Sequence, residues 1–99
     1  MIIVQIEHEV LNFESWQKAF DSDPIDRKEI GVQRYSILLL KDNPNHVVVD
    51  LEFDNLPEAE NTCTLLRKMW VRIDGTMLIN PRVRILHRIR QQEMFRSGV

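Results

Sequence analysis

The chain has 99 residues, of which 43% are hydrophobic and 28% charged, and this composition is typical of one globular domain. Its net charge of −2 and its lack of a signal-peptide pattern or a long apolar run lead us to expect neither a nucleic-acid partner nor a membrane partner. The single cysteine, Cys63, excludes an intrachain disulfide and fits a cytoplasmic location.

Residues 2–10 alternate with a period of two, which predicts a strand with two unlike faces. One face carries isoleucine, valine and a single histidine, His8, and the other face becomes acidic. Asn12 then predicts a helix N-cap, and Trp16 and Phe20 belong to the apolar stripe of the helix that follows. We expect this stripe to pack on the strand face that carries His8, so that His8 and Trp16 meet in one cavity.

Each of these two residues also has a simpler interpretation. His8 is either a histidine at the edge of the core, hydrogen-bonded to a neighbour, or a polar group that points into an apolar pocket. In the second case its pKa would respond to burial and to nearby charge. Trp16 is either an ordinary core residue or one wall of that pocket.

The middle of the chain predicts a hairpin. A polar segment that ends at Gly31 is expected to form a loop and a short helical turn, which places Arg27 within reach of the mouth of the pocket. Residues 32–41 and 46–53 predict the second and third strands, joined by a turn of aspartate, asparagine and proline. Tyr35 lies on the second strand, and the sequence does not decide which face carries it.

The second half of the chain predicts a helix and a strand. Asn55 is expected to cap a helix over residues 56–73, whose apolar stripe includes Trp70. Residues 76–79 are expected to cross one end of the sheet and close the cavity. Residues 82–90 predict the last strand, with His87 on its apolar face, and residues 91–99 form a tail, either frayed or a short helix.

The order strand, helix, strand, strand, helix, strand predicts an α+β, ferredoxin-like fold with one four-stranded antiparallel sheet and two helices on one face. The other face collects acidic residues on the first and third strands and arginines on the fourth. At the edge of the sheet, residues 38–40 are three leucines, and an apolar edge of this kind invites pairing with another chain. We therefore expect a homodimer in which two sheets face each other as a dimeric α/β barrel.

About 80 residues of the sequence resemble the dimeric α/β-barrel superfamily, and in particular its antibiotic-biosynthesis-monooxygenase-like proteins. The resemblance is carried by the motif HxVxNFxxWxxxFD at residues 8–21, by Arg27, by Gly31-Val32, by the turn DxPN at residues 42–45, and by residues 49–57. It implies a homodimer with one cavity per subunit between the helices and the sheet. Some members oxidise polycyclic aromatic substrates without metal or flavin, and others degrade haem.

The resemblance also implies which residues surround the cavity. The family pattern usually has aspartate at the position of Asn12, and either residue can cap a helix. We expect no cofactor and no metal, because two histidines alone, His8 and His87 on adjacent strands, are a weak signal for metal binding. Residue types that the family uses around its cavity match at five positions: His8, Asn12, Trp16, Tyr35 and Trp70. Together with residues placed by the predicted elements, they give three catalytic candidates, His8, Asn12 and Arg27, and five candidates for contact with a small-molecule substrate, Trp16, Phe20, Tyr35, Trp70 and His87.

Three functions remain open from the sequence. The first is an enzyme, in which His8 accepts a proton from a planar phenolic substrate and Arg27 or Asn12 stabilises the anion before oxygen reacts. The second is a non-catalytic binding or sensing module that uses the same pocket. The third is a structural dimer whose pocket is filled by its own side chains. An RNA-binding sheet face is not expected, because Asp50 and Glu52 would repel phosphate.

Overall fold

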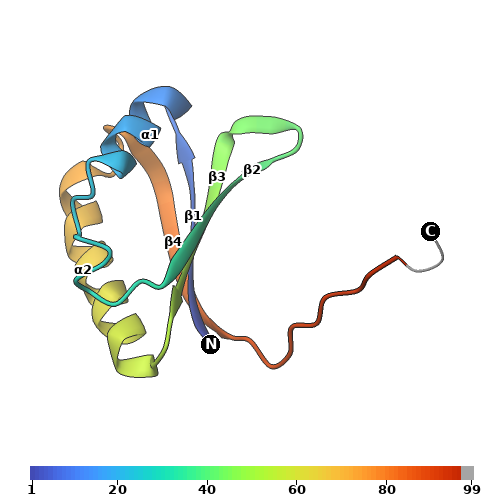
Figure 1. The fold of residues 1–99 in the computed structure, drawn as a ribbon. Helices are drawn as coiled ribbons and strands as arrows, with labels where there is room; N and C mark the ends of the chain where they lie inside the picture. Colours follow the sequence, from blue (N-terminus) through green and yellow to red (C-terminus); the bar gives the residue numbers. More distant parts are fainter. Residues whose placement is uncertain (97–99) are drawn as a thin grey trace.

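The computed structural model describes residues 1–96. The chain alternates strands and helices in the predicted order (Figure 1). The elements are β1 (Ile2–Val10), α1 (Phe13–Asp21), β2 (Arg34–Leu40), β3 (Asn43–Phe53), α2 (Leu56–Ile73) and β4 (Leu78–His87).

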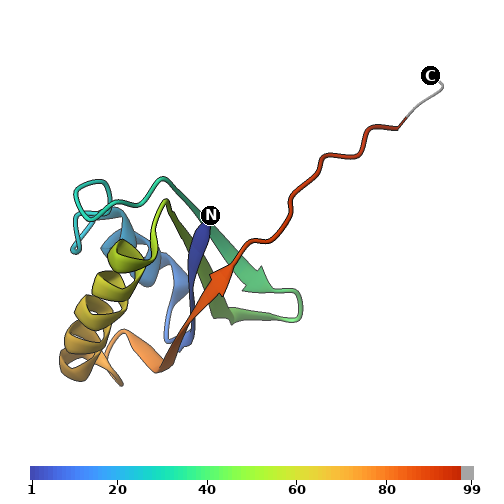
Figure 2. The ribbon, with the colours of Figure 1, turned by 90° about the horizontal axis from the view of Figure 1, so that it is seen from below.

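The four strands form one antiparallel sheet in the order β2-β3-β1-β4, with β1 and β3 in the centre. Both helices cover the same face of this sheet and leave the other face open (Figure 1). Figure 2 shows the same two layers from below, with the residues after β4 running away from the body. The α+β, ferredoxin-like arrangement expected from the sequence is therefore confirmed.

The two helices begin where the sequence predicts them, because each has an asparagine cap. The side-chain oxygen of Asn12 accepts a hydrogen bond of 2.9 Å from the Ser15 N–H, and that of Asn55 accepts one of 3.0 Å from the Glu58 N–H. These bonds satisfy N–H groups that have no partner inside the helix.

The core lies between the helices and the sheet. It is built from the inward-facing residues of the two central strands, among which Val4, Leu51 and Phe53 are at most 1% exposed. Trp16 of α1 and Trp70 of α2 close the core from the helix side, each at 6% exposure. Burying a large apolar side chain of this kind contributes roughly 1.5–3 kcal/mol, so the two central strands and the two tryptophans hold the layers together.

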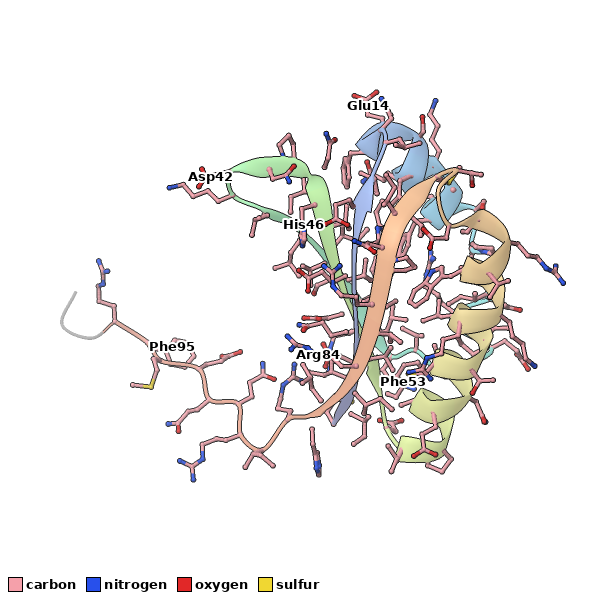
Figure 3. The ribbon with its side chains drawn as sticks, turned by 180° about the vertical axis from the view of Figure 1, so that it is seen from behind. Glu14, Asp42, His46, Phe53, Arg84 and Phe95 are labelled. Atoms are coloured by element: carbon pink, nitrogen blue, oxygen red, sulfur yellow. The ribbon has the colours of Figure 1, made fainter. Side chains whose placement is uncertain are left out.

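The open face of the sheet carries the expected pairing of acid with base. Glu52 accepts a hydrogen bond of 2.8 Å from Arg88 and one of 3.2 Å from Arg34, and the Glu7 carboxylate lies 2.5 Å from the His46 imidazole. Seen from behind (Figure 3), His46 and Arg84 point into the open side, whereas Phe53 lies on the side of α2. Such cross-strand pairs stabilise the sheet and fix which residues face each other.

The fourth strand differs from its predicted bounds. It begins at Leu78, so part of the segment expected to cross the sheet end is already strand, and it ends at His87. Pro81 is tolerated because β4 is an edge strand, where a missing N–H breaks no ladder bond. The pairing of β1 with β4 shifts register between Glu7 and Glu9, next to Pro81, and this shift lets β4 begin at Leu78. Ile89, predicted to lie in the strand, is outside it and is 85% exposed.

The tail is extended where the structure describes it. Residues 88–96 have no regular secondary structure, so the short helix weighed for this segment does not form there, and residues 97–99 lie outside the described part. The second and third strands run over Arg34–Leu40 and Asn43–Phe53, against the expected 32–41 and 46–53. In the described residues no helix is long and apolar enough to cross a membrane.

Candidate functional site

A cavity of about 660 Å³ lies between the sheet and the two helices. Ile6, His8 and Val49 contribute to its floor from the two central strands. Trp16 from α1 and Trp70 from α2 form parts of its walls. The cavity therefore has apolar and aromatic sides with one imidazole among them.

His8 reaches the cavity because β1 alternates, so that position 8 shares the inward face with the buried valine and isoleucine side chains. The residue is 2% exposed, and its Nδ1 lies 3.3 Å from the main-chain oxygen of Glu9. Since a carbonyl oxygen can only accept a hydrogen bond, Nδ1 carries the hydrogen and Nε2 keeps its lone pair. Nε2 has no hydrogen-bond partner within residues 1–96 and is not sealed from solvent there, so it faces the cavity.

Burial lowers the pKa of His8 below 6.5, because the charged imidazolium loses its hydration, and the hydrogen bond to Glu9 only partly opposes this effect. His8 is therefore neutral at neutral pH. A neutral imidazole with a free Nε2 can accept a proton from a molecule in the cavity.

Aromatic rings continue from His8 along one side of the site. The rings of His8 and Trp16 are steeply inclined to each other, with 5.4 Å between their centroids, and the centroids of Trp16 and Phe20 are 5.3 Å apart. Phe20 in turn meets Tyr35 edge-on, with 5.2 Å between centroids. Because Tyr35 pairs with the inward-facing Leu51, it lies on the helix side of the sheet, which the sequence had left undecided.

Four contacts hold Arg27 beside these aromatic rings. Its guanidinium carbon lies 4.0 Å from the Phe20 ring centroid and 5.0 Å from that of Tyr35. Its Nη1 donates a hydrogen bond of 2.7 Å to the Phe20 carbonyl oxygen and lies 3.5 Å from the Asp23 carboxylate. The side chain is 13% exposed and lines the cavity. A fixed positive charge therefore sits beside the apolar space.

The structure brings five of the eight candidate residues to the cavity lining: His8, Trp16, Phe20, Arg27 and Trp70. Tyr35 is 47% exposed and does not line the cavity, but it contacts two residues that do, Phe20 and Arg27.

The other two candidates lie elsewhere. Asn12 is exposed and its side-chain oxygen caps α1. His87 is exposed and pairs with Ile2, six residues along β1 from His8, which corresponds to about 20 Å along a strand. These two histidines therefore do not share a site. Within residues 1–96 no group of three histidine, cysteine or acidic side chains is placed to hold a metal ion.

Several lining residues were not among the candidates. Met69 and Ile73 follow Leu65 at four-residue spacing on α2, and this spacing was the available signal for them. Lys68 and Arg72 keep the same spacing one position earlier and also line the cavity. Met77 and Leu78 line it as well, in the segment that was expected to close one end.

No family model matches the sequence, and no curated protein matches it either. Solved structures match over nearly the whole chain. A variant of SnoaB, a cofactor-independent oxygenase from Streptomyces nogalater, aligns with a TM-score of 0.70 at 10% identity, covering 91% of this chain and 94% of the other. A putative antibiotic biosynthesis monooxygenase from Deinococcus radiodurans aligns with a TM-score of 0.67 at 13% identity, covering 96% and 99%.

A dimeric ferredoxin-like protein from an uncultured marine organism aligns with a TM-score of 0.68 at 14% identity, covering 92% of this chain and 97% of the other. At these identities the likeness concerns the fold. The resemblance noted in the sequence is confirmed at that level: the chain has the ferredoxin-like fold of the antibiotic-biosynthesis-monooxygenase-like proteins.

Proposed function

We propose that this protein is a homodimer that binds a small planar or aromatic molecule in the cavity between helices and sheet. We further propose that His8 accepts a proton from this molecule in an oxygenation that needs neither metal nor flavin. The observation that carries the proposal is a neutral imidazole with a free Nε2 inside an aromatic cavity.

The dimensions of the cavity suit this kind of ligand. Its volume of about 660 Å³ lies within the range of roughly 300–1,000 Å³ that is usual for small-molecule sites. Trp16 and Trp70 offer flat apolar surfaces, and a two- or three-ring molecule between them would bury most of its area. The ring edges would then lie near His8.

The chemistry follows from the two charged or ionisable groups. Nε2 of His8 takes a proton from an acidic carbon or hydroxyl group of the substrate, and the Arg27 guanidinium stabilises the resulting anion. Dioxygen is the oxidant: a ring CH₂ group becomes a carbonyl, one oxygen atom enters the product, and the other leaves as water. SnoaB, whose structure is similar to that of this chain, is a cofactor-independent oxygenase.

The dimer is supported by the surface of the single chain. Leu38 on the open face of the sheet and Leu40 at the end of β2 are 47% and 52% exposed, and Met94 and Phe95 on the tail are 85% and 84% exposed. Exposed apolar side chains that lie close together are typical of a protein interface. Two similar structures are described as dimeric.

The test measures oxygen uptake with a panel of hydroxylated two- and three-ring aromatic compounds. We expect His8→Ala to abolish uptake while the protein still binds the compound, because the base is lost and the walls remain. His87→Ala is the matched control, since it removes an exposed histidine outside the cavity. Full uptake by His8→Ala would remove the imidazole from the mechanism.

A second candidate is a non-catalytic binding or sensing module, and one observation favours it. Asn12 caps α1 and does not line the cavity, and Nη1 of Arg27 donates to a main-chain carbonyl, so both candidates for stabilising an anion beside His8 have other partners. In this case aromatic compounds would quench the fluorescence of Trp16 and Trp70 with no oxygen consumed.

A further inference from the structure

We infer that the natural ligand is an aromatic anion, with its rings inside the cavity and a carboxylate or similar negative group at the mouth. This inference rests on the proposed ligand-binding function and adds the charge of the ligand to it.

The first observation is the charge of the cavity lining. Arg27, Lys68 and Arg72 line it, whereas none of the 15 acidic residues of the chain does. His8 is neutral at neutral pH because burial lowers its pKa. Three basic side chains therefore line the cavity of a chain whose net charge is −2, and one of them, Arg27, also lies 3.5 Å from the Asp23 carboxylate outside the lining.

The second observation is the arrangement of these charges on separate elements. Lys68 and Arg72 are four residues apart, so they project from the same side of α2. Arg27 comes from the loop between α1 and β2 and is fixed against Phe20. Positive charge thus reaches the cavity from two separate parts of the fold.

The third observation concerns the partners of these side chains. Lys68 and Arg72 are exposed and form no ion pair with any residue between 1 and 96. Basic residues near a helix C-terminus are common because they complement the helix dipole. Arg27 has a partner of its own, since its Nη1 lies 3.5 Å from the Asp23 carboxylate. The dipole does not explain the lack of acidic residues in the cavity lining, whereas an anionic ligand explains both this lack and the unpaired Lys68 and Arg72.

The geometry also sets how such a ligand lies. The buried end of the cavity has His8 and the two tryptophans, and the two basic residues of α2 are exposed to solvent. An aromatic anion would bury its rings against the tryptophans and keep its charged group at the wet rim. There the interaction is screened, and one exposed charge changes affinity by roughly two- to fivefold.

The experiment compares 2-naphthoate with 2-naphthalenemethanol, which has the same rings and no charge, by isothermal titration calorimetry at low salt and in 0.5 M NaCl. We expect the wild-type protein to bind the naphthoate more tightly and to lose this preference at high salt. The double variant Lys68→Gln with Arg72→Gln should weaken naphthoate binding by roughly tenfold and leave binding of the alcohol unchanged.

The control is Arg67→Gln, which removes the same charge from the same helix outside the cavity lining. It should leave the preference for naphthoate intact. Equal binding of the two compounds, or an equal effect of the control and the double variant, overturns the charge inference and leaves the cavity proposal standing. If neither compound binds, the proposed function fails together with the inference.

Discussion

The burial of His8 predicts how the stability of the protein depends on pH. The pKa of His8 is lowered by burial from its ordinary value of 6.5, so below pH 6.5 the unfolded chain binds a proton that the folded chain does not. Stability that is intact above pH 6.5 is therefore lost as the pH falls toward the folded pKa. One pH unit in this window corresponds to at most about 1.4 kcal/mol, so we expect a loss of about 1 kcal/mol between pH 7.5 and pH 5.5 from this residue.

His8→Leu isolates this contribution, because it fills the same space and cannot be protonated. The assay is urea unfolding at pH 7.5 and pH 5.5, at one protein concentration so that a dimer equilibrium does not shift the result. We expect the variant to lose about 1 kcal/mol less than the wild type between the two pH values. His87→Leu, at an exposed site, should behave like the wild type. Equal losses for wild type and His8→Leu would show that protonation of His8 does not cause the loss of stability.

Three further predictions follow from packing and surface. Trp16→Ala should destabilise the fold by roughly 3–5 kcal/mol in thermal or urea unfolding, because the ring is 6% exposed; Val71→Ala, at an 85% exposed position of α2, should change stability little. Gly31→Ala and Gly75→Ala should each lower the unfolding midpoint, because both glycines have positive φ values, 104° and 89°, which a residue with a Cβ adopts only with strain. An unchanged midpoint in both variants would contradict this. Leu38→Lys should shift the protein from dimer to monomer in analytical ultracentrifugation, whereas Val71→Lys should leave it dimeric; a Leu38→Lys dimer would place the interface elsewhere.

The start of each helix was predictable from the sequence because its signals are local. A capping asparagine followed by an apolar stripe fixes a helix start within a few residues, as at Asn12 and Asn55. The strand β1 was predictable because its alternation is strict. The start of β4 was missed because Asn80-Pro81 is a turn signal, and only the position of β4 at the sheet edge makes the proline harmless.

A site residue was predictable from the sequence only where the sheet face that carries it is enough to place it at the cavity. Alternation placed His8 on the inward face, but it gave His87 the same face without showing that it lies at the other end of the sheet. Tyr35 was undecided because β2 is apolar on both faces, and its register with β3 settles the question. Lys68 and Arg72 were missed because charged residues on a helix are usually solvated, and their position beside the cavity depends on tertiary packing.

The proposed function depends on His8 being a neutral imidazole whose Nε2 faces a ligand-binding cavity. The most direct measurement is the ¹⁵N NMR spectrum of the His8 ring at pH 7, without and with 2-naphthoate. We expect a neutral ring with the hydrogen on Nδ1 and a change in the Nε2 signal when the ligand is added. A charged ring at pH 7, or a hydrogen on Nε2 with no response to any aromatic compound, would contradict it.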